Sequence, residues 1–182
     1  MRNFKKALSL CLVLVLLVGT LSITAFATDT YTVKFYVNGT EQTTWQRTGT
    51  VGQNVYTTVS TLTNPLAVFD DVEDYYTPGT YHKALISIGT YGPTHASYSD
   101  IPDEYFDDYG TITTTTNPYY FILETGSQGT HYLYLGYAWT YHYIGGADLW
   151  DYMDDCYPTA NRIVEVVYSL QASDFWSTNV IG

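Results

Sequence analysis

The stretch that decides the fold is TYTVKFYVNG, residues 30–39. Its apolar side chains Val33, Phe35 and Val37 recur at every second position, which is the period of a strand with one buried face. Asn38-Gly39 follows directly, and Asn-Gly after such a strand is a strong signal for a tight hairpin turn. Residues 30–37 are therefore predicted to form the first strand of a hairpin.

The residues after this turn predict a second strand and then a helix. The partner strand is expected over residues 42–50, with Trp45 on one of its faces. Residues 55–62 then carry apolar side chains at i, i+4 and i+7, the spacing of one helix face, and the segment 52–54 can cap that helix. The helix has to end before Pro65, because the residue ahead of a proline is pushed out of the helical region.

Residues 69–118 differ in character from the rest of the chain. Two acidic groups, at 70–74 and 100–108, flank one apolar strand predicted over 84–88. The four threonines of 113–116 suit a strand better than a linker, because they are β-branched. We interpret the whole stretch as a large acidic insertion or an elaborated loop system.

The C-terminal half predicts further strands over residues 119–123, 131–135, 137–144 and 162–168. Apolar pairs on both faces of the last one indicate a central position in the sheet. The 20 tyrosines and the many threonines also favour strands, because aromatic and β-branched side chains fit a pleated surface. The predicted class is α+β: a strand-rich mixed sheet with one short helix.

These elements resemble a known family. The hairpin and helix of residues 31–62, the run GYAWTYHYIGG over 136–146 and the strand that closes near Trp176 are similar to the secreted bacterial domains related to the C-terminal domain of transcobalamin. Those domains are soluble-ligand-binding β-grasp folds. The resemblance, which covers about half of the chain after residue 27, implies a β-grasp-like fold and a non-catalytic extracellular module, with a corrinoid as the family's ligand.

Residues 1–27 have the pattern of an export signal. Three basic residues precede a long apolar run, which ends in Ala25-Phe26-Ala27, a small-x-small cleavage site. We expect cleavage before Thr28 and a single domain over residues 28–182. The mature protein is then secreted or associated with the cell surface, with no membrane span after cleavage.

The charge of the chain limits its partners. After residue 27, four basic side chains less 18 acidic ones leave a formal charge of −14. Nucleic acid and anionic membranes are poor partners for such a field, which leaves a small molecule, a glycan or a surface protein. Cys156 is the single cysteine after residue 27, so no intrachain disulfide can form, and we expect a buried thiol.

A row of rings is the predicted ligand-binding site. Tyr137, Trp139, Tyr141 and Tyr143 lie on one face if residues 137–143 form a strand. Such a row is either a packing stripe in the core or a platform on which a sugar or a planar ligand stacks. The three phenol hydroxyls favour partial exposure, because a buried hydroxyl needs a partner.

A group of four aspartates, Asp148, Asp151, Asp154 and Asp155, is the candidate metal site. On a short helix, acidic side chains would share one side and Met153 and Cys156 the other, so a solvated helix face explains the pattern. A calcium ion held by the carboxylates is the alternative. The segment does not have the spacing of an EF-hand loop.

The sequence carries no recognisable catalytic motif. Its four histidines are scattered, and neither a His-Glu-x-x-His nor a Gly-x-Ser-x-Gly pattern occurs. We therefore expect an exported, non-catalytic ligand-binding or cell-surface interaction module. Two alternatives stay open: a secreted glycosidase-like enzyme that uses the carboxylates of 100–108, and a structural surface or matrix protein that assembles through strand edges.

Overall fold

The structure is a computed structural model that describes residues 29–74, 76–144 and 152–181. It is strand-rich, with 50% of the residues in strands and 12% in helices, and it contains a curled mixed sheet. The strand-rich mixed sheet with few helices is therefore confirmed. The predicted export signal lies outside the described residues, as do Asp148 and Asp151. No helix in the described ranges has both the length and the apolar character that a membrane span requires.

The described helices and strands are distributed along most of the chain. In order they are β1 (Thr30–Val37), β2 (Thr40–Glu41), the 3-10 helix η1 (Thr43–Trp45), β3 (Arg47–Thr50), α2 (Val55–Val59), β4 (Ala67–Glu73), β5 (Tyr81–Ile88), β6 (Thr94–His95), the 3-10 helix η2 (Tyr98–Asp100), α3 (Asp103–Tyr109), β7 (Thr113–Thr114), β8 (Tyr120–Gly126), β9 (Gly129–Tyr143) and β10 (Ile163–Ser177).

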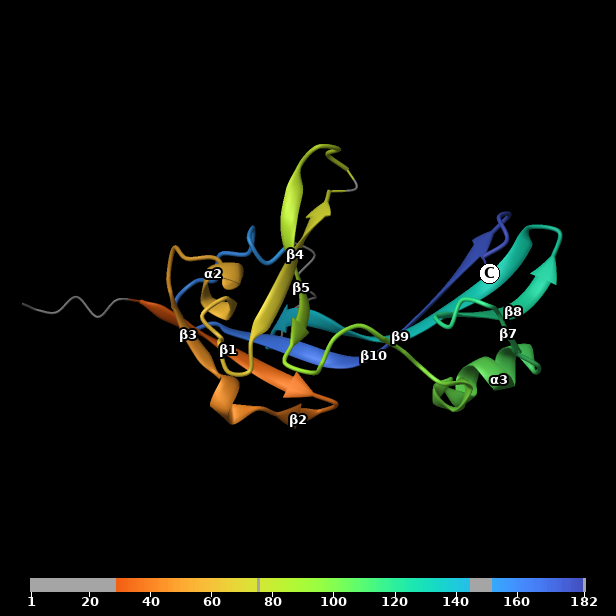
Figure 1. The fold of residues 1–182 in the computed structure, drawn as a ribbon, viewed down its shortest axis with the longest axis horizontal. Helices are drawn as coiled ribbons and strands as arrows, with labels where there is room; N and C mark the ends of the chain where they lie inside the picture. Colours follow the sequence, from red (N-terminus) through yellow and green to blue (C-terminus); the bar gives the residue numbers. More distant parts are fainter. Residues whose placement is uncertain (1–28, 75, 145–151, 182) are drawn as a thin grey trace, which may run out of the picture.

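The main sheet has the strand order β2-β1-β10-β9-β8-β7 (Figure 1). β1 runs parallel to β10, and the other neighbours in this order are antiparallel. β3 adds to β1 and β6 adds to β9, while β4 and β5 form a separate two-stranded sheet. β10 is central, as its apolar pattern predicts.

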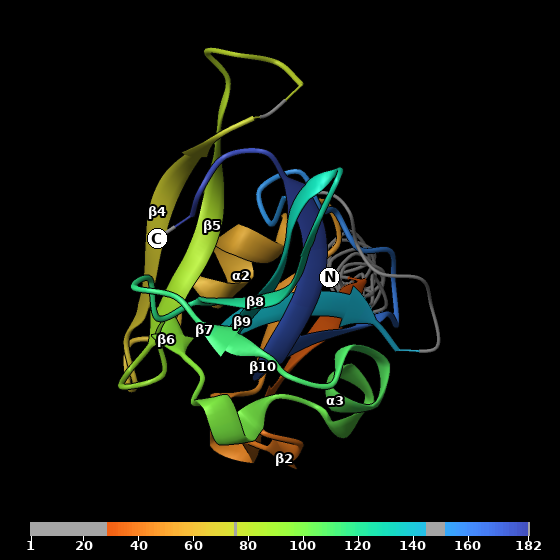
Figure 2. The ribbon, with the colours of Figure 1, turned by 90° about the vertical axis from the view of Figure 1, so that its right-hand side faces the viewer.

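Two lobes share the long strands β9 and β10, which are 15 residues each (Figure 1). We call β1, β3, α2, β4 and β5 with the adjoining half of the long strands the first lobe. The second lobe consists of β7, β8, α3 and the other half. Each lobe has its own hydrophobic core, and β9 and β10 contribute to both. Figure 2, viewed from the end with the second lobe, shows the β4–β5 hairpin beside the curled sheet.

In the first lobe, β1 and α2 form as their sequence patterns predict. Val55 and Val59 of α2 and the following Leu62 are fully buried against β1 and β10. The side chain of Asn54 caps the helix, since its Oδ1 accepts a hydrogen bond of 2.9 Å from the backbone N–H of Thr57. Because these contacts bury one face of α2, packing stabilises a helix that would be too short to persist alone.

The partner strand predicted over residues 42–50 is only partly right. Asn38 and Gly39 do adopt the positive φ angles of a tight turn, 47° and 79°. The chain then pairs with β1 for two residues, leaves the ladder as η1, and returns as β3. This detour places the ring of Trp45 edge-on against Phe35, with 6.3 Å between centroids.

The strand predicted over 137–144 is longer than expected. It joins the one predicted over 131–135, so that β9 runs unbroken through Gly136. At Gly136 a Cβ would lie 3.1 Å from the ring of Tyr119 and 3.2 Å from the carbonyl oxygen of Thr94, so glycine allows this close approach. The final strand also continues well past residue 168, and these extensions create the second lobe.

The acidic stretch 69–118 is distributed over both lobes. Its first acidic group lies on and just after β4, and the predicted strand 84–88 is the second half of β5, in the first lobe. The second acidic group lies on η2 and α3 in the second lobe, and the threonine run contains β7. Whether the stretch is an insertion into a smaller domain stays a prediction.

Candidate functional site

A pocket opens in the second lobe where four segments meet. Its volume is about 200 Å³. The lining combines aromatic rings with short polar side chains: His95, Ala96, Ser97, Tyr98, Thr114, Thr115, Asn117, Pro118, Tyr120 and Phe121. One wall is the segment that follows β6, and the other consists of β7, the turn after it and the start of β8. The pocket can therefore take a small ligand that has both apolar and polar groups.

Hydrogen bonds hold the turn that forms the polar wall. Thr115 Oγ1 lies 2.8 Å from the carbonyl oxygen of Asn117 and 2.9 Å from that of Tyr120, and it accepts a bond from the backbone N–H of Asn117. Asn117 Oδ1 accepts a bond of 3.1 Å from the backbone N–H of Tyr119. Within the described part of the chain, Asn117 Nδ2 donates to no partner and remains available to a ligand.

Half-buried tyrosines continue from the pocket along the sheet. Tyr120, in the pocket wall, meets Tyr134 at 5.7 Å between ring centroids. The ring of Tyr119 stacks on Tyr134 at 5.9 Å with an interplanar angle of 5°, and His95 meets Tyr119 edge-on. Burial, with smaller contributions from Tyr119 and Tyr120, raises the pKa of Tyr134 above its ordinary value. The phenol of Tyr134 therefore stays neutral at physiological pH, and its ring stacks with the neighbouring tyrosines.

The predicted row Tyr137, Trp139, Tyr141 and Tyr143 lies on one face of β9, as expected. All four side chains are half-buried. Trp139, Tyr141 and Tyr143 pack against the core of the first lobe, and Tyr137 packs against the core of the second. The row thus contributes to packing along the length of β9, and ligand binding on it stays a prediction.

The loop between β5 and β6 covers part of this row. Trp139 Nε1 donates a hydrogen bond of 2.8 Å to the carbonyl oxygen of Tyr91, and the hydroxyl of Tyr168 donates one of 2.8 Å to that of Gly92. The ring of Tyr91 meets both Tyr168 and Trp45, at 5.5 and 6.1 Å between centroids. A ligand that stacks on Trp139 therefore has to compete with this loop.

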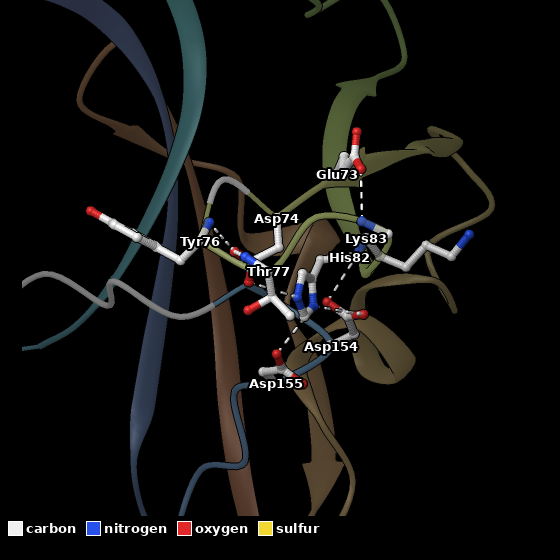
Figure 3. Close-up of polar contacts among 9 residues, drawn as sticks. Glu73, Asp74, Tyr76, Thr77, His82, Lys83, Asp154 and Asp155 are labelled. Atoms are coloured by element: carbon white, nitrogen blue, oxygen red, sulfur yellow. Dashed lines mark hydrogen bonds and ion pairs between the residues drawn. The ribbon is translucent and has the colours of Figure 1, made fainter.

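Two of the four predicted metal ligands face a histidine in the structure (Figure 3). His82 Nδ1 lies 3.1 Å from Asp155 Oδ2 and 3.7 Å from Asp154 Oδ2, and His82 Nε2 lies 3.3 Å from Asp74 Oδ2. The imidazole is buried and stacks on the ring of Tyr152 at 4.2 Å between centroids. The imidazole of His82 therefore occupies the place between the carboxylates that a bound cation would otherwise take.

The carboxylates of this cluster also accept hydrogen bonds from backbone N–H groups. Asp154 Oδ1 accepts a hydrogen bond of 3.0 Å from the N–H of Lys83, and Asp74 Oδ1 accepts bonds from Tyr76 and Thr77. The bond from the N–H of Tyr76, with further help from Thr77 and His82, holds the pKa of Asp74 below its ordinary value. The cluster therefore joins the β4–β5 hairpin to the segment around residue 154.

The helix predicted around the four aspartates is not seen at its C-terminal end. Residues 153–155 form a turn, so Asp154 and Asp155 do not lie at the end of a described helix. The apolar positions are as expected, since Met153 and Cys156 are buried in the core of the first lobe, where Cys156 Sγ lies 3.6 Å from the hydroxyl oxygen of Tyr143. Among the described residues, no group of three or more His, Cys, Asp or Glu side chains is arranged to hold a metal ion.

We expect calcium to leave the melting temperature of the wild-type protein unchanged at fixed ionic strength, because Asp154 and Asp155 already face His82. His82→Ala removes this partner and leaves three carboxylates close together. Millimolar calcium should then raise the melting temperature of the variant, since a ligand that binds only the folded state stabilises it. Thermal melts of both proteins with and without calcium measure the two shifts in melting temperature. A rise in the wild type as large as that in the variant would show that the wild-type aspartates bind calcium, as the alternative from the sequence holds.

The carboxylates of α3 do not converge on a cleft. Asp103, Glu104, Asp107 and Asp108 are all exposed, whereas the rings on the other side of the helix pack against the core of the second lobe. Asp100 is engaged locally, because its Oδ2 accepts a hydrogen bond of 2.7 Å from the backbone N–H of Ser97. This arrangement is that of a solvated helix face.

The pocket was not predicted from the sequence. Its walls come from segments about 20 residues apart, around Ser97 and Asn117, and neither segment carries a recognised ligand motif. The one local signal is Asn117-Pro118 after four threonines, which predicts a turn next to a strand. That signal locates the polar wall but does not indicate a cavity.

No protein family, no curated protein and no solved structure matches this chain. The resemblance to transcobalamin-like domains therefore stays a prediction. The functional conclusion rests on the geometry of the chain itself.

Proposed function

We propose that this protein is an exported, non-catalytic binding module that holds one sugar ring of a glycan in the pocket of the second lobe. The observation that carries the proposal is the pocket itself, a cavity of about 200 Å³ whose lining combines aromatic rings with hydroxyl and amide groups. Sites for small molecules generally combine a largely apolar lining with a few placed polar groups.

The size of the pocket restricts the ligand. Pockets for drug-sized molecules begin at about 300 Å³, so this one suits a single ring or the end group of a longer ligand. A whole corrinoid exceeds it, and the pocket therefore does not support the ligand that the family resemblance implies. A terminal sugar suits it, because its C–H face can stack on Tyr120 and its hydroxyl groups can pair with Asn117 and Thr114.

The charge of the chain favours a neutral ligand. The whole sequence has a formal charge of −11, and the part after residue 27 is more acidic still. Such a field repels phosphates, nucleic acids and anionic lipids. Neutral glycans are not subject to this repulsion, and they are the class that an exported protein meets outside the cell.

We also propose that the first lobe is β-grasp-like. The parallel pair of β1 and β10, the β1–β3 hairpin and the helix α2 across one face support this interpretation. In this view the second lobe is an addition built on the extended ends of β9 and β10. The binding pocket then belongs to the added second lobe. Similarity between the first lobe and a known fold would therefore not identify the ligand of the pocket.

Substitution of Asn117 by aspartate tests the proposed site. Asn117→Asp keeps the oxygen that accepts from Tyr119 but removes the amide donor, and losing a hydrogen bond to a ligand commonly costs about 1 kcal/mol or more. We expect binding to the best ligand on an array of neutral glycans to fall at least about fivefold.

Thr116→Asp is the matched control, since it adds the same charge at an exposed neighbour outside the pocket lining. Equal loss of binding in both variants would mean that charge alone acts. A wild-type protein that retains no glycan from the array would remove the proposed function.

A further inference from the structure

The outer edge of β10 is open along the second lobe. β1 pairs with β10 only from residue 163 to residue 168, and the last backbone bond on this side runs from the N–H of Asn38 to the carbonyl oxygen of Tyr168. β9 pairs with the opposite edge as far as Ser177. In the described ranges no other strand pairs with the outer edge of residues 169–177, a stretch of nine residues.

The backbone groups on this edge point outward in a regular pattern. The carbonyl oxygens of Arg162 and Tyr168 both face β1, where they accept bonds from Thr32 and Asn38. Backbone groups alternate in direction along a strand, so the N–H and C=O groups of the even-numbered residues 170, 172, 174 and 176 face outward too. The pairing with β9 has no register shift, so no bulge interrupts the edge.

The edge has few of the features that usually prevent strands from pairing. Residues 169–177 read SLQASDFWS, without lysine, proline or glycine and with Asp174 as their one charge. Natural sheets protect open edges with charged side chains, prolines or bulges. Trp176 in addition keeps 40% of its surface exposed, although large rings are usually covered. A long, continuous and sparsely charged edge of this kind is suited to strand addition.

We propose that this edge binds the same edge of a second copy of the chain, in an antiparallel pair around a two-fold axis. The open stretch ends at residue 168 on one side, where β1 stops, and at residue 177 on the other. A symmetric pair that uses all of it places Ser173 on the axis. Residue 172 of one copy then lies opposite residue 174 of the other, and residue 170 lies opposite residue 176. The limits of the open stretch therefore determine the register.

The side chains are complementary in this register. Asp174 lies opposite Ala172 of the second copy, so the two Asp174 carboxylates of the dimer are not directly opposite each other. Trp176 lies opposite Leu170, and apolar cross-strand pairs of this kind stabilise sheets. The outward-facing residues 170, 172, 174 and 176 pair with one another across the axis, so every outward backbone donor has an acceptor. A second copy therefore suits this edge better than an arbitrary extended segment.

Charge variants at Ala172 test the pairing and its register. Ala172 is exposed, so either substitution leaves the fold intact. Ala172→Asp places a carboxylate opposite Asp174 twice in each dimer, whereas Ala172→Lys places an ammonium group there. Like charges opposite each other destabilise a pair and opposite charges stabilise it, so we expect dissociation constants that differ by about tenfold, with the lysine variant tighter.

Sedimentation of the secreted chain from micromolar to millimolar concentration, at physiological ionic strength, measures these constants. The expected result is a wild-type dimer that Ala172→Asp weakens and Ala172→Lys strengthens. A chain that stays monomeric over the whole range overturns the proposal, as does a dimer on which both variants act equally. Glycan binding by the two variants should match the wild type, because the edge lies outside the pocket lining, so this proposal and the proposed function can fail independently.

Discussion

Replacement of Gly49 by alanine should destabilise the protein by about 3 kcal/mol, because the first lobe has no space for the added methyl group. Gly49 pairs with Tyr31 across β3 and β1, and a Cβ at this position would overlap the ring of Tyr31 and the hydroxyl of Thr58. Tyr31 cannot move aside easily, since it is fully buried and its hydroxyl bonds to Thr58 at 2.5 Å and to the carbonyl oxygen of Asn54 at 2.9 Å.

Gly52→Ala is the matched control for this substitution. Gly52 has a φ of 93°, but nothing lies within 4 Å of a Cβ there, so the cost is only the backbone strain of about 1 kcal/mol. Urea unfolding of both variants gives the two free energies. A loss at Gly49 that is no greater than the loss at Gly52 would contradict the packing described for Tyr31.

Trp139→Ala is expected to lower the free energy of unfolding by about 3 kcal/mol. This value is at the lower end for truncation of a large aromatic side chain in a core, because Trp139 is only half-buried. The indole packs on Tyr168 at 5.2 Å between centroids and bonds to the carbonyl oxygen of Tyr91. Its loss therefore removes ring contacts and releases the loop between β5 and β6. Differential scanning calorimetry measures the change, and a cost below about 1 kcal/mol would show that the row is not part of the core.

The other rings of the row separate packing from binding. Tyr137→Ala, Tyr141→Ala and Tyr143→Ala should each destabilise the fold while leaving glycan binding by the folded fraction unchanged. If one of them stays within about 0.5 kcal/mol of the wild type, as substitutions outside a core usually do, and yet abolishes binding, the ring row is the ligand site and the pocket is not.

The local sequence pattern predicted the strand β1 and the helix α2 of the first lobe. The alternation of 30–37 and the i, i+4, i+7 spacing of 55–62 each bury one face against the same core, so local periodicity and tertiary packing agree there. The cap at Asn54 is a local interaction and could be read from the sequence. The break at η1 could not, since Trp45 leaves the strand to reach a ring that is ten residues away.

The second lobe depends on contacts that no local pattern contains. Gly136 resembles a strand end in the sequence, yet β9 passes through it, and β6 pairs closely with β9 at this position. The partner of Asp154 is another such case. His82 lies about 70 residues earlier, and only the folded β4–β5 hairpin brings it to the carboxylates. Aspartates that suggested a cation in the sequence are thus placed around a side chain of the protein itself.

Amide chemical shifts of the labelled protein, followed during titration with the best glycan from the array, show directly whether the ligand binds in the second lobe. We expect shifts in the segments that line the pocket, 95–98 and 114–121, with the amides of 139–143 unmoved. Shifts confined to the ring row and Tyr91, with the pocket unchanged at saturation, would contradict it.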